Sequence, residues 1–261
     1  MKLSAPIYQL KSRAKALRKS CSCTLSKALD QVAQQEGFSS WSLLQSKTKD
    51  LLPKRYEDIL DYFNEGDLVL LGARPMVGKT SFATGLFVKS VLRQLQKNYY
   101  YSLAEIGSDV VGRMKAYASF IEDSGNMYEI DCTDEICADY IIGKTTGQIG
   151  PGSLVVIDYL QLLDERRVTP PIQEQVQKLK SYAQKQGCII IFIAQINRKV
   201  EYRADRKPSA DDVRLPNPLD LKLFNKMLFL SKDDAEIEVV FAGKTNHKLQ
   251  VSWNEIIHRV G

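Results

Sequence analysis

The pattern of hydrophobic and polar positions divides this chain near residue 53. Before that point, hydrophobic residues recur at helical spacing, as Leu10, Ala14 and Leu17 do. Thr24 is suited to cap a second helix, which Gly37 would end, and a third helix is expected to follow. The beginning of the chain is therefore predicted to form a small all-α module.

From residue 67 onwards, short apolar runs alternate with amphipathic segments. Strands are expected at 67–72, 98–103, 127–131, 153–158 and 188–194. Helices are expected at 79–96, 107–121, 133–143 and 171–186. The C-terminal part becomes strand-like again, at 226–230, 236–242 and 248–253. Alternating strands and helices predict an α/β fold with a mostly parallel sheet, which C-terminal antiparallel strands extend.

Composition agrees with a globular protein of two parts. Of the 261 residues, 44% are hydrophobic and 26% are charged, as is usual for soluble domains. We expect a helical module over 1–52, a linker over 53–66 and an α/β domain over 67–261. The longest strongly apolar run, 188–194, is too short to cross a membrane, so a cytoplasmic protein is expected. The five cysteines lack zinc-site spacing and are expected to be free thiols.

Positive charge is concentrated in the predicted helical module. Residues 1–55 contain 11 lysines and arginines but only 3 acidic residues, whereas the rest of the chain is slightly acidic. A basic appendage on a mildly acidic domain indicates nucleic acid as a partner. A solvated helical face without a partner is the alternative.

The first strand of the α/β domain ends in a small-residue loop that leads to Gly78, Lys79 and Thr80. A nucleoside triphosphate fits this order of strand, loop and helix, because loop N–H groups surround phosphates and the helix N-terminus favours their charge. Lys79 would reach the β- and γ-phosphates, and the Thr80 hydroxyl would bind Mg²⁺. An ordinary strand–turn–helix corner with a surface lysine is the alternative. The expected nucleotide-binding residues are Ala73, Arg74, Pro75, Met76, Val77, Gly78, Lys79, Thr80 and Ser81.

Two later strands end in polar residues that suit the same site. Asp158 ends an apolar run and is expected to hold Mg²⁺ beside the Thr80 hydroxyl, with a carboxylate that caps a turn as the alternative. Gln195 follows the apolar run 188–194 and would sense the γ-phosphate if that strand lies beside the phosphate loop.

A loop rich in cations follows Gln195. It contains Arg198, Arg203 and Arg214. Such charge in a long loop after a sheet strand suits the phosphates of a single-stranded nucleic acid. A solvated loop is the alternative.

Together these motifs resemble the ATPase domain of bacterial replicative helicases of the DnaB type. The similar segments are 72–80, 156–162, 194–198, 203–205 and 212–214, and the resemblance covers roughly residues 54–250. It implies a RecA-like fold, assembly into a six-membered ring, and movement on single-stranded DNA with ATP hydrolysis between subunits. It also implies an ATP·Mg²⁺ site at Gly78, Lys79, Thr80 and Asp158, with Gln195 as the γ-phosphate sensor. The helical module instead resembles a small module attached to assorted bacterial proteins.

The chain departs from the family pattern at three positions. The family's catalytic glutamate directly follows Ser-Leu, whereas here Ala104 takes that place and Glu105 comes one residue late. Because side chains alternate along a strand, this shift would turn Glu105 to the opposite face, unless the backbone bends at the strand end. The family's arginine finger is missing, and Lys244 would serve as a point charge toward the neighbouring subunit. A proline-containing segment, 215–218, stands where the family's DNA-contacting loop has Glu-Ser-Gly.

Two functions therefore stay open, beside a more distant third, an interaction module with a decayed loop, which the intact Lys79, Thr80 and Asp158 disfavour. A DnaB-like ATPase would use Lys79, Glu105 and Gln195 in catalysis, and would hydrolyse slowly because losing a group that orients water costs about 10²–10⁴ in rate. The alternative is a non-hydrolytic nucleotide-binding protein that regulates or partners a helicase complex. In either case a monomer or weak oligomer is expected without ATP, and a hexamer is the form that the resemblance implies with ATP.

Overall fold

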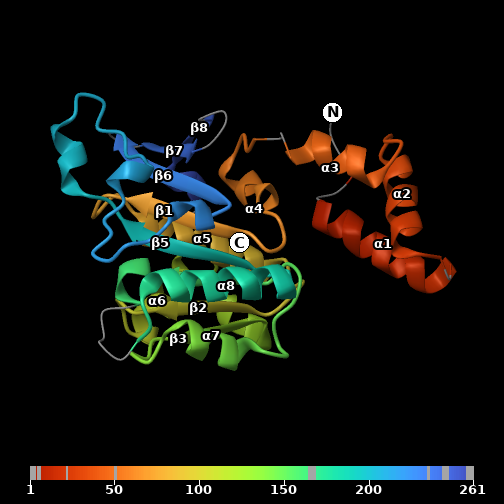
Figure 1. Ribbon diagram of the computed structural model, residues 1–261, viewed down its shortest axis with the longest axis horizontal. Coiled ribbons are helices and arrows are strands. Elements are labelled where there is room, and N and C mark those ends of the chain that lie inside the picture. Colours follow the sequence, from red (N-terminus) through yellow and green to blue (C-terminus); the bar gives the residue numbers. More distant parts are fainter. Residues whose placement is uncertain are drawn as a thin grey trace. The chain divides into compact units, whose positions relative to one another are not determined.

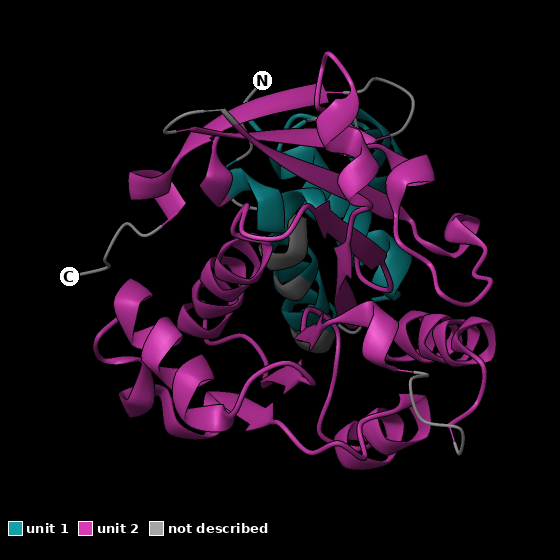
Figure 2. Ribbon diagram, turned by 90° about the vertical axis from the view of Figure 1, so that its left-hand side faces the viewer, with its two compact units in different colours: residues 1–54, 58–62 teal, residues 55–57, 63–261 magenta. Residues whose placement is uncertain are grey.

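A computed structural model describes residues 4, 7–21, 23–49, 52–163, 169–233, 236–242 and 247–256 (Figure 1). The chain divides into two compact units, which Figure 2 distinguishes by colour. One unit comprises residues 1–54 and 58–62, and the other comprises residues 55–57 and 63–261. In the described part of the chain, no helix combines the length and apolar character needed to cross a membrane.

The smaller unit is helical. Its helices are α1 (Ile7–Cys21), α2 (Leu25–Gln35), α3 (Trp41–Lys49) and α4 (Ile59–Tyr62). The hydroxyl of Thr24 accepts a hydrogen bond from the Lys27 N–H, so the predicted cap of α2 is present. The Asp30 carboxylate accepts a 2.9 Å hydrogen bond from the Trp41 N–H and thereby joins α2 to the start of α3. The side chains buried in this unit's core include Leu10, Ala14, Val32, Phe38, Trp41 and Leu44.

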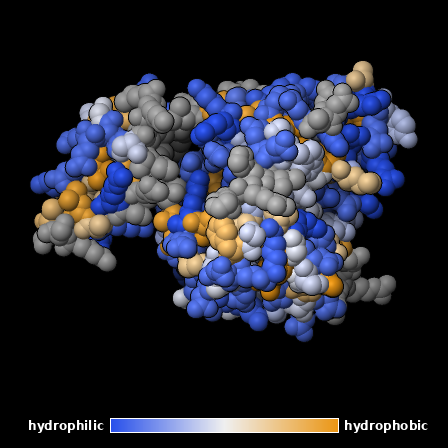
Figure 3. All heavy atoms as spheres, turned by 180° about the vertical axis from the view of Figure 1, so that it is seen from behind, coloured by the Kyte–Doolittle hydropathy of each residue, from blue (hydrophilic) through white to orange (hydrophobic). Residues whose placement is uncertain are grey.

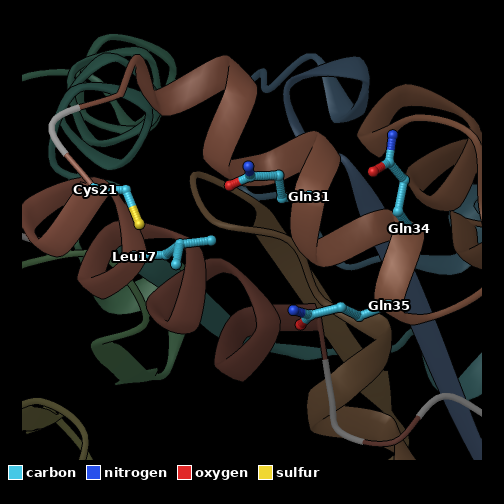
Figure 4. Close-up of a pocket in the computed structure, with 5 residues that line it drawn as sticks. All are labelled: Leu17, Cys21, Gln31, Gln34 and Gln35. Atoms are coloured by element: carbon cyan, nitrogen blue, oxygen red, sulfur yellow. The ribbon is translucent and has the colours of Figure 1, made fainter.

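A pocket of about 510 Å³ lies between α1 and α2 (Figure 4). Its lining consists of Leu17, Cys21, Gln31, Gln34 and Gln35. None of these side chains carries a cationic group, so the positive charge of this segment is not gathered in the pocket.

The larger unit is built on one sheet of eight strands in the order β3-β2-β4-β5-β1-β6-β7-β8. The strands are β1 (Leu68–Ala73), β2 (Asn98–Ser102), β3 (Tyr128–Asp131), β4 (Leu154–Asp158), β5 (Ile189–Gln195), β6 (Lys226–Asp233), β7 (Glu236–Ala242) and β8 (His247–Ser252). All pairs from β3 to β6 are parallel, whereas β7 is antiparallel to both β6 and β8. The predicted α/β fold, with a mostly parallel sheet and antiparallel C-terminal strands, is confirmed.

Helices cover both faces of the central sheet. They are α5 (Lys79–Leu92), α6 (Gly107–Tyr117), α7 (Ala138–Thr145), α8 (Ile172–Gln186) and α9 (Trp253–Ile256). Short 3₁₀ turns occur at η1 (Tyr56–Asp58), η2 (Ile121–Met127), η3 (Leu160–Leu162), η4 (Arg198–Tyr202), η5 (Ala210–Asp212) and η6 (Leu221–Leu223). Strands β1, β2 and β4 are buried along their whole length, as parallel strands between two helical layers must be.

Alternation along the strands assigns the residues to the two helical layers. Val155 and Ile157 of β4 belong to the same core as α7 and α8. Tyr100 of β2 faces the other side, where its ring meets Phe87 of α5 edge-on at 5.3 Å between centroids. Because side chains alternate, Asp158 also faces the α5 layer.

Three of the predicted helices differ from the structure by several residues, and the one expected at 79–96 ends at Leu92, shortly before Gln94 with its φ of +48°. The helix expected at 133–143 begins only at Ala138, because side chains hold the preceding residues in turns: Thr133 N–H donates to Asp131 and Glu135 N–H donates to Thr133. The helix expected at 107–121 ends at Tyr117 and is followed by the 3₁₀ segment η2, inside which Gly125 has φ +45°.

On the face that Figure 3 shows, hydrophilic side chains predominate and hydrophobic residues occur in small groups. The most exposed large hydrophobic residues of the described chain are Met76, Ile106 and Tyr202, at 98%, 65% and 90%. All three lie on loops that follow the carboxyl ends of parallel strands. Ligands of open α/β sheets bind at that edge.

Gly85 lets three other segments approach α5, namely those that carry Tyr56, Tyr117 and Ile256. A Cβ at this position would lie 2.4 Å from the Tyr56 hydroxyl and 2.9 Å from the Tyr117 ring. Both tyrosine hydroxyls are tied to α5, Tyr56 to the Phe82 carbonyl and Tyr117 to the Ser81 carbonyl. We expect Gly85→Ala to lower the free energy of unfolding by about 1–2 kcal/mol, because overpacking outweighs the helix preference of alanine.

Gly112 in α6 offers a matched control for this prediction, because a Cβ there would meet nothing within 4 Å. Gly112→Ala should raise the free energy of unfolding by about 0.5–1 kcal/mol. Denaturant unfolding of both variants checks the pair, and equal shifts at the two positions would contradict the packing described for α5.

Candidate nucleotide-binding site

Residues 73–81 form one continuous unit of strand end, loop and helix start. Gly78 has φ +98°, a conformation that suits glycine, and α5 begins directly after it. The Phe82 N–H donates to the Gly78 carbonyl at 2.8 Å, so this loop passes into the helix without a break. Met76, at the tip of the loop, is 98% exposed. Gly78 makes no side-chain cap for this 14-residue helix, and the first N–H groups of a helix, which have no partner within it, form a favourable site for phosphate.

The indole of Trp253 lies directly against this loop. A Cβ on Gly78 would come within 2.1 Å of the Trp253 ring, so only glycine allows the approach. Trp253 begins α9, whose Ile256 carbonyl lies over Gly85 on the same helix α5. Sequence reasoning missed Trp253, because no local pattern connects the end of the chain with the phosphate loop.

Asp158 ends β4 next to Thr80 and Lys79. Its side chain is buried, at 2% exposure, and its Oδ2 atom has no hydrogen-bond partner among the described residues. Burial raises the pKa of Asp158, while a hydrogen bond from the Thr80 hydroxyl and the charge of Lys79 lower it, and the charge of Glu105 raises it further. The balance is a pKa above the ordinary value of an aspartate.

This arrangement fits a Mg²⁺-bound triphosphate. An unpaired carboxylate oxygen in a buried position is costly unless a cation or donor completes it. Among the described residues, no group of three or more His, Cys, Asp or Glu side chains could hold a metal ion by itself. Mg²⁺ does not need such a group, because it binds through one or two protein oxygens, substrate phosphates and water. Thr80 and Asp158 are the residues that would hold it.

Gln195 lies beside the phosphate loop. Its predicted role as a γ-phosphate sensor depends on this position. Strand β5 pairs with β1, and the register sets Ala73 opposite Gln195. Gln161, which follows Asp158 by one short turn, is buried and donates to the carbonyls of Gln195 and Arg214 at 3.3 and 2.7 Å. Sequence reasoning assigned no role to Gln161, although a polar residue within an otherwise apolar segment was a visible signal.

Glu105 lies on the side of the sheet where Asp158 and Lys79 lie. Side chains do not continue to alternate up to this residue, because the backbone leaves the strand after Ser102 and turns back: the Glu105 N–H donates to the Ser102 hydroxyl at 3.1 Å. The carboxylate forms a two-pronged ion pair with Arg113 of α6, and its charge raises the pKa of Asp158. Of the two possibilities for Glu105, the structure shows the bend at the strand end, since side chains alternate only while the chain stays extended.

The basic loop after β5 is exposed at Arg198, Arg203 and Arg214. Arg203 is engaged within the loop, because its guanidinium lies 2.7 Å from the Asp212 carboxylate. In the described part of the chain, Arg198 and Arg214 form no ion pair with a carboxylate. The structure therefore leaves two of the three predicted cations available and holds the third in place.

Two ion pairs attach the basic loop to its surroundings. Arg74 of the phosphate loop lies 3.1 Å from the Glu201 carboxylate in η4. Lys207 lies 2.9 Å from the buried Glu238 on β7. Tyr202, between these anchors, is 90% exposed. Sequence reasoning overlooked Tyr202, although an aromatic residue among cations is a known signal for nucleic-acid binding. The predicted inter-subunit residue, Lys244, lies outside the described residues.

Comparisons with known proteins agree with this geometry. Residues 143–234 match the family model of the DnaB-like helicase C-terminal domain. A probable plasmid replicative DNA helicase of Chlamydia trachomatis serovar L2 is 24% identical over 242 residues, which cover 80% of this chain and 53% of that protein. The replicative DNA helicase DnaB of Geobacillus stearothermophilus is 27% identical over 203 residues, which cover 66% of this chain and 44% of that protein. The chain thus spans about half the length of the curated relatives it matches.

Two solved structures show the same fold. One is an ATPase domain, which matches with a TM-score of 0.66 and 21% identity, covering 83% of this chain and 94% of that one. The other is a DnaB-like replicative helicase, solved in a study of its interactions with primase, which matches with a TM-score of 0.65 and 18% identity, covering 94% of this chain and 74% of that one. The fold is therefore that of RecA-like ATPase domains, and residues 143–234 are similar to the C-terminal domain of DnaB-like helicases.

Proposed function

We propose that this chain is a cytoplasmic, DnaB-like ATPase that binds ATP·Mg²⁺ and single-stranded DNA and hydrolyses ATP slowly. The observation that carries the nucleotide part is Asp158. Its unpaired buried oxygen lies beside the Thr80 hydroxyl and the charge of Lys79, at the end of the strand that faces the phosphate-loop helix. Bound between Thr80 and Asp158, Mg²⁺ would neutralise charge on the β- and γ-phosphates.

The exposed loop after β5 supports the nucleic-acid part of the proposal. Arg198 and Arg214 offer charge to phosphates, and the exposed ring of Tyr202 offers a surface on which a base can stack. The ion pair between Arg74 and Glu201 connects this loop to the phosphate loop. This ion pair would therefore couple a strand of DNA on the loop to a nucleotide on the phosphate loop.

Slow hydrolysis follows from the departures from the family pattern. Ala104 stands where a carboxylate is expected, so water must be oriented by Glu105 from a different backbone position. Lys244 would replace a forked guanidinium with a point charge, and arginine fingers are worth about 10³–10⁵ in rate. Assembly into a hexamer when ATP is bound, with Lys244 at the interface, is part of this proposal and is supported by the resemblance alone.

Steady-state ATP turnover, with and without single-stranded DNA, tests this function. We expect a slow basal rate, which single-stranded DNA raises. Tyr202→Ala should lower the DNA-stimulated rate toward the basal value, since stacking contributes about 1–3 kcal/mol per base. Tyr202→Phe keeps the ring and should behave as the unaltered protein does. ATP binding without turnover under both conditions would favour the alternative of a non-hydrolytic regulatory or partner protein.

A further inference from the structure

Helix α6 carries two polar side chains that reach the nucleotide site. Arg113 donates two hydrogen bonds to the Glu105 carboxylate, one of them 2.6 Å long. Tyr117 donates a 2.6 Å hydrogen bond from its hydroxyl to the carbonyl of Ser81 in the first turn of α5. Residues four apart lie on the same face of a helix, so one face of α6 contacts both the phosphate-loop helix and Glu105.

The buried residues of α6 explain why this face is fixed. Val110, Met114 and Tyr117 form its inner stripe, with exposures of 0%, 0% and 4%, at the spacing of an amphipathic helix. The stripe sets the rotation of α6, and the Tyr117 bond sets its position along α5. The packing of α6 thereby fixes the backbone position of Arg113 relative to α5, the helix that begins with Lys79 and Thr80.

The contact between Arg113 and Glu105 fixes the orientation of the carboxylate. A guanidinium that binds both oxygens fixes the plane of the group as well as its position. An ionised carboxylate has about four acceptor sites, so two bonds from arginine leave about two for water. Both side chains are about a quarter exposed, at 24% and 27%, and therefore remain accessible to water.

We propose that Arg113 is a positioning residue for ATP hydrolysis: it holds Glu105 beside Asp158 and thereby compensates for Ala104. The inference rests on the proposed function in its hydrolytic form. Glu105 orients a water molecule whose oxygen forms the new bond to the γ-phosphorus, while the bond from that phosphorus to the bridging oxygen of ADP breaks. The proton of the water passes to the Glu105 carboxylate and from there to solvent.

Substitutions of Arg113 in the whole chain test this role by separating kcat from KM. Arg113→Gln should lower kcat about 10- to 100-fold, within the range for a water-orienting group, and leave the ATP affinity unchanged. Arg113→Lys keeps the charge without the fork and should retain an intermediate kcat. Glu105→Gln should lower kcat to a similar extent, and combining it with Arg113→Gln should add little, because the two residues act as one unit.

Lys115→Gln provides the matched control on the same helix. Lys115 is paired with Glu122 at 2.9 Å, with both side chains about half exposed, so the charge change is equal but lies away from the nucleotide site. This variant should leave kcat and KM unchanged. A fall in kcat that Lys115→Gln reproduces would overturn the specific role of Arg113.

The remaining outcomes are also decisive. Unchanged or raised kcat in Arg113→Gln would overturn the inference, as would a loss of ATP affinity and melting temperature that accounts for the whole effect. ATP binding without any turnover in the unaltered chain would overturn the inference while nucleotide binding stands. Absence of ATP binding would overturn the proposed function itself.

Discussion

Asp158→Asn is expected to raise the stability of the ligand-free protein and to abolish its stabilisation by ATP·Mg²⁺. The buried carboxylate has one oxygen without a partner among the described residues, and burial is the largest cause of its raised pKa. An ionised group in that position costs folding free energy, which the neutral amide avoids. We expect a gain of about 0.5–2 kcal/mol, as is common for substitutions that relieve a destabilised functional site.

The pH dependence of stability follows from the same group. A carboxyl whose pKa is higher in the folded than in the unfolded state binds more protons when the protein is folded. The free energy of unfolding should therefore fall as the pH rises from about 3.8 through the raised pKa of Asp158 in the folded protein. Asp158→Asn should remove this decline. Thermal unfolding across that pH range checks the sign.

Asp131 at the end of β3 is the control for this prediction. Its carboxylate accepts hydrogen bonds from the Thr133 N–H and the Tyr140 hydroxyl, at 3.0 and 2.7 Å. Asp131→Asn therefore removes no unpaired charge and should leave stabilisation by ATP·Mg²⁺ intact. If Asp158→Asn lowered stability or kept the full ligand effect, the metal-holding role of Asp158 would be wrong.

Lys79→Ala should also weaken stabilisation by ATP·Mg²⁺, but it should have the opposite effect on the ligand-free protein. Lys79 lowers the pKa of Asp158 and therefore stabilises its charge; without it, the ligand-free protein should melt at a lower temperature. Loss of a charged hydrogen-bond donor to phosphate costs about 1.5–3 kcal/mol, which corresponds to roughly a 10- to 100-fold loss of ATP affinity.

The double variant separates these two effects. Once Asp158 is Asn, no charge remains for Lys79 to stabilise, so Lys79→Ala should no longer lower the melting temperature. Melting curves of the single and double variants, with and without ATP·Mg²⁺, form a complete cycle. Additive changes in melting temperature would show that Lys79 and Asp158 do not interact in the ligand-free protein.

Local sequence patterns sufficed for the fold and for the centre of the candidate site. Strands β1, β4 and β5 are nearly uniform apolar runs, and each is followed by a polar residue or loop at the same edge of the sheet. Gln195 could be set beside the phosphate loop only once β5 was known to pair with β1. Strand order is a long-range property that no single run of residues contains.

The limits of sequence reasoning have physical causes as well. Alternation alone does not place Glu105, because the chain bends after Ser102, where the Glu105 N–H donates to the Ser102 hydroxyl. Trp253 has no local signal, because its contact with Gly78 depends on how α9 lies against α5 and the phosphate loop. The ion pair of Arg113 with Glu105 could not be predicted from helical periodicity, because Glu105 lies before the first residue of α6.

Calorimetric titration of the whole chain with ATP in the presence of Mg²⁺ tests the central claim most directly. We expect saturable binding of one nucleotide per chain, weaker when Mg²⁺ is removed and about 10- to 100-fold weaker in Lys79→Ala. Binding that is absent at millimolar ATP, or that Lys79→Ala leaves unchanged, would contradict the assignment of residues 73–81 as a nucleotide site.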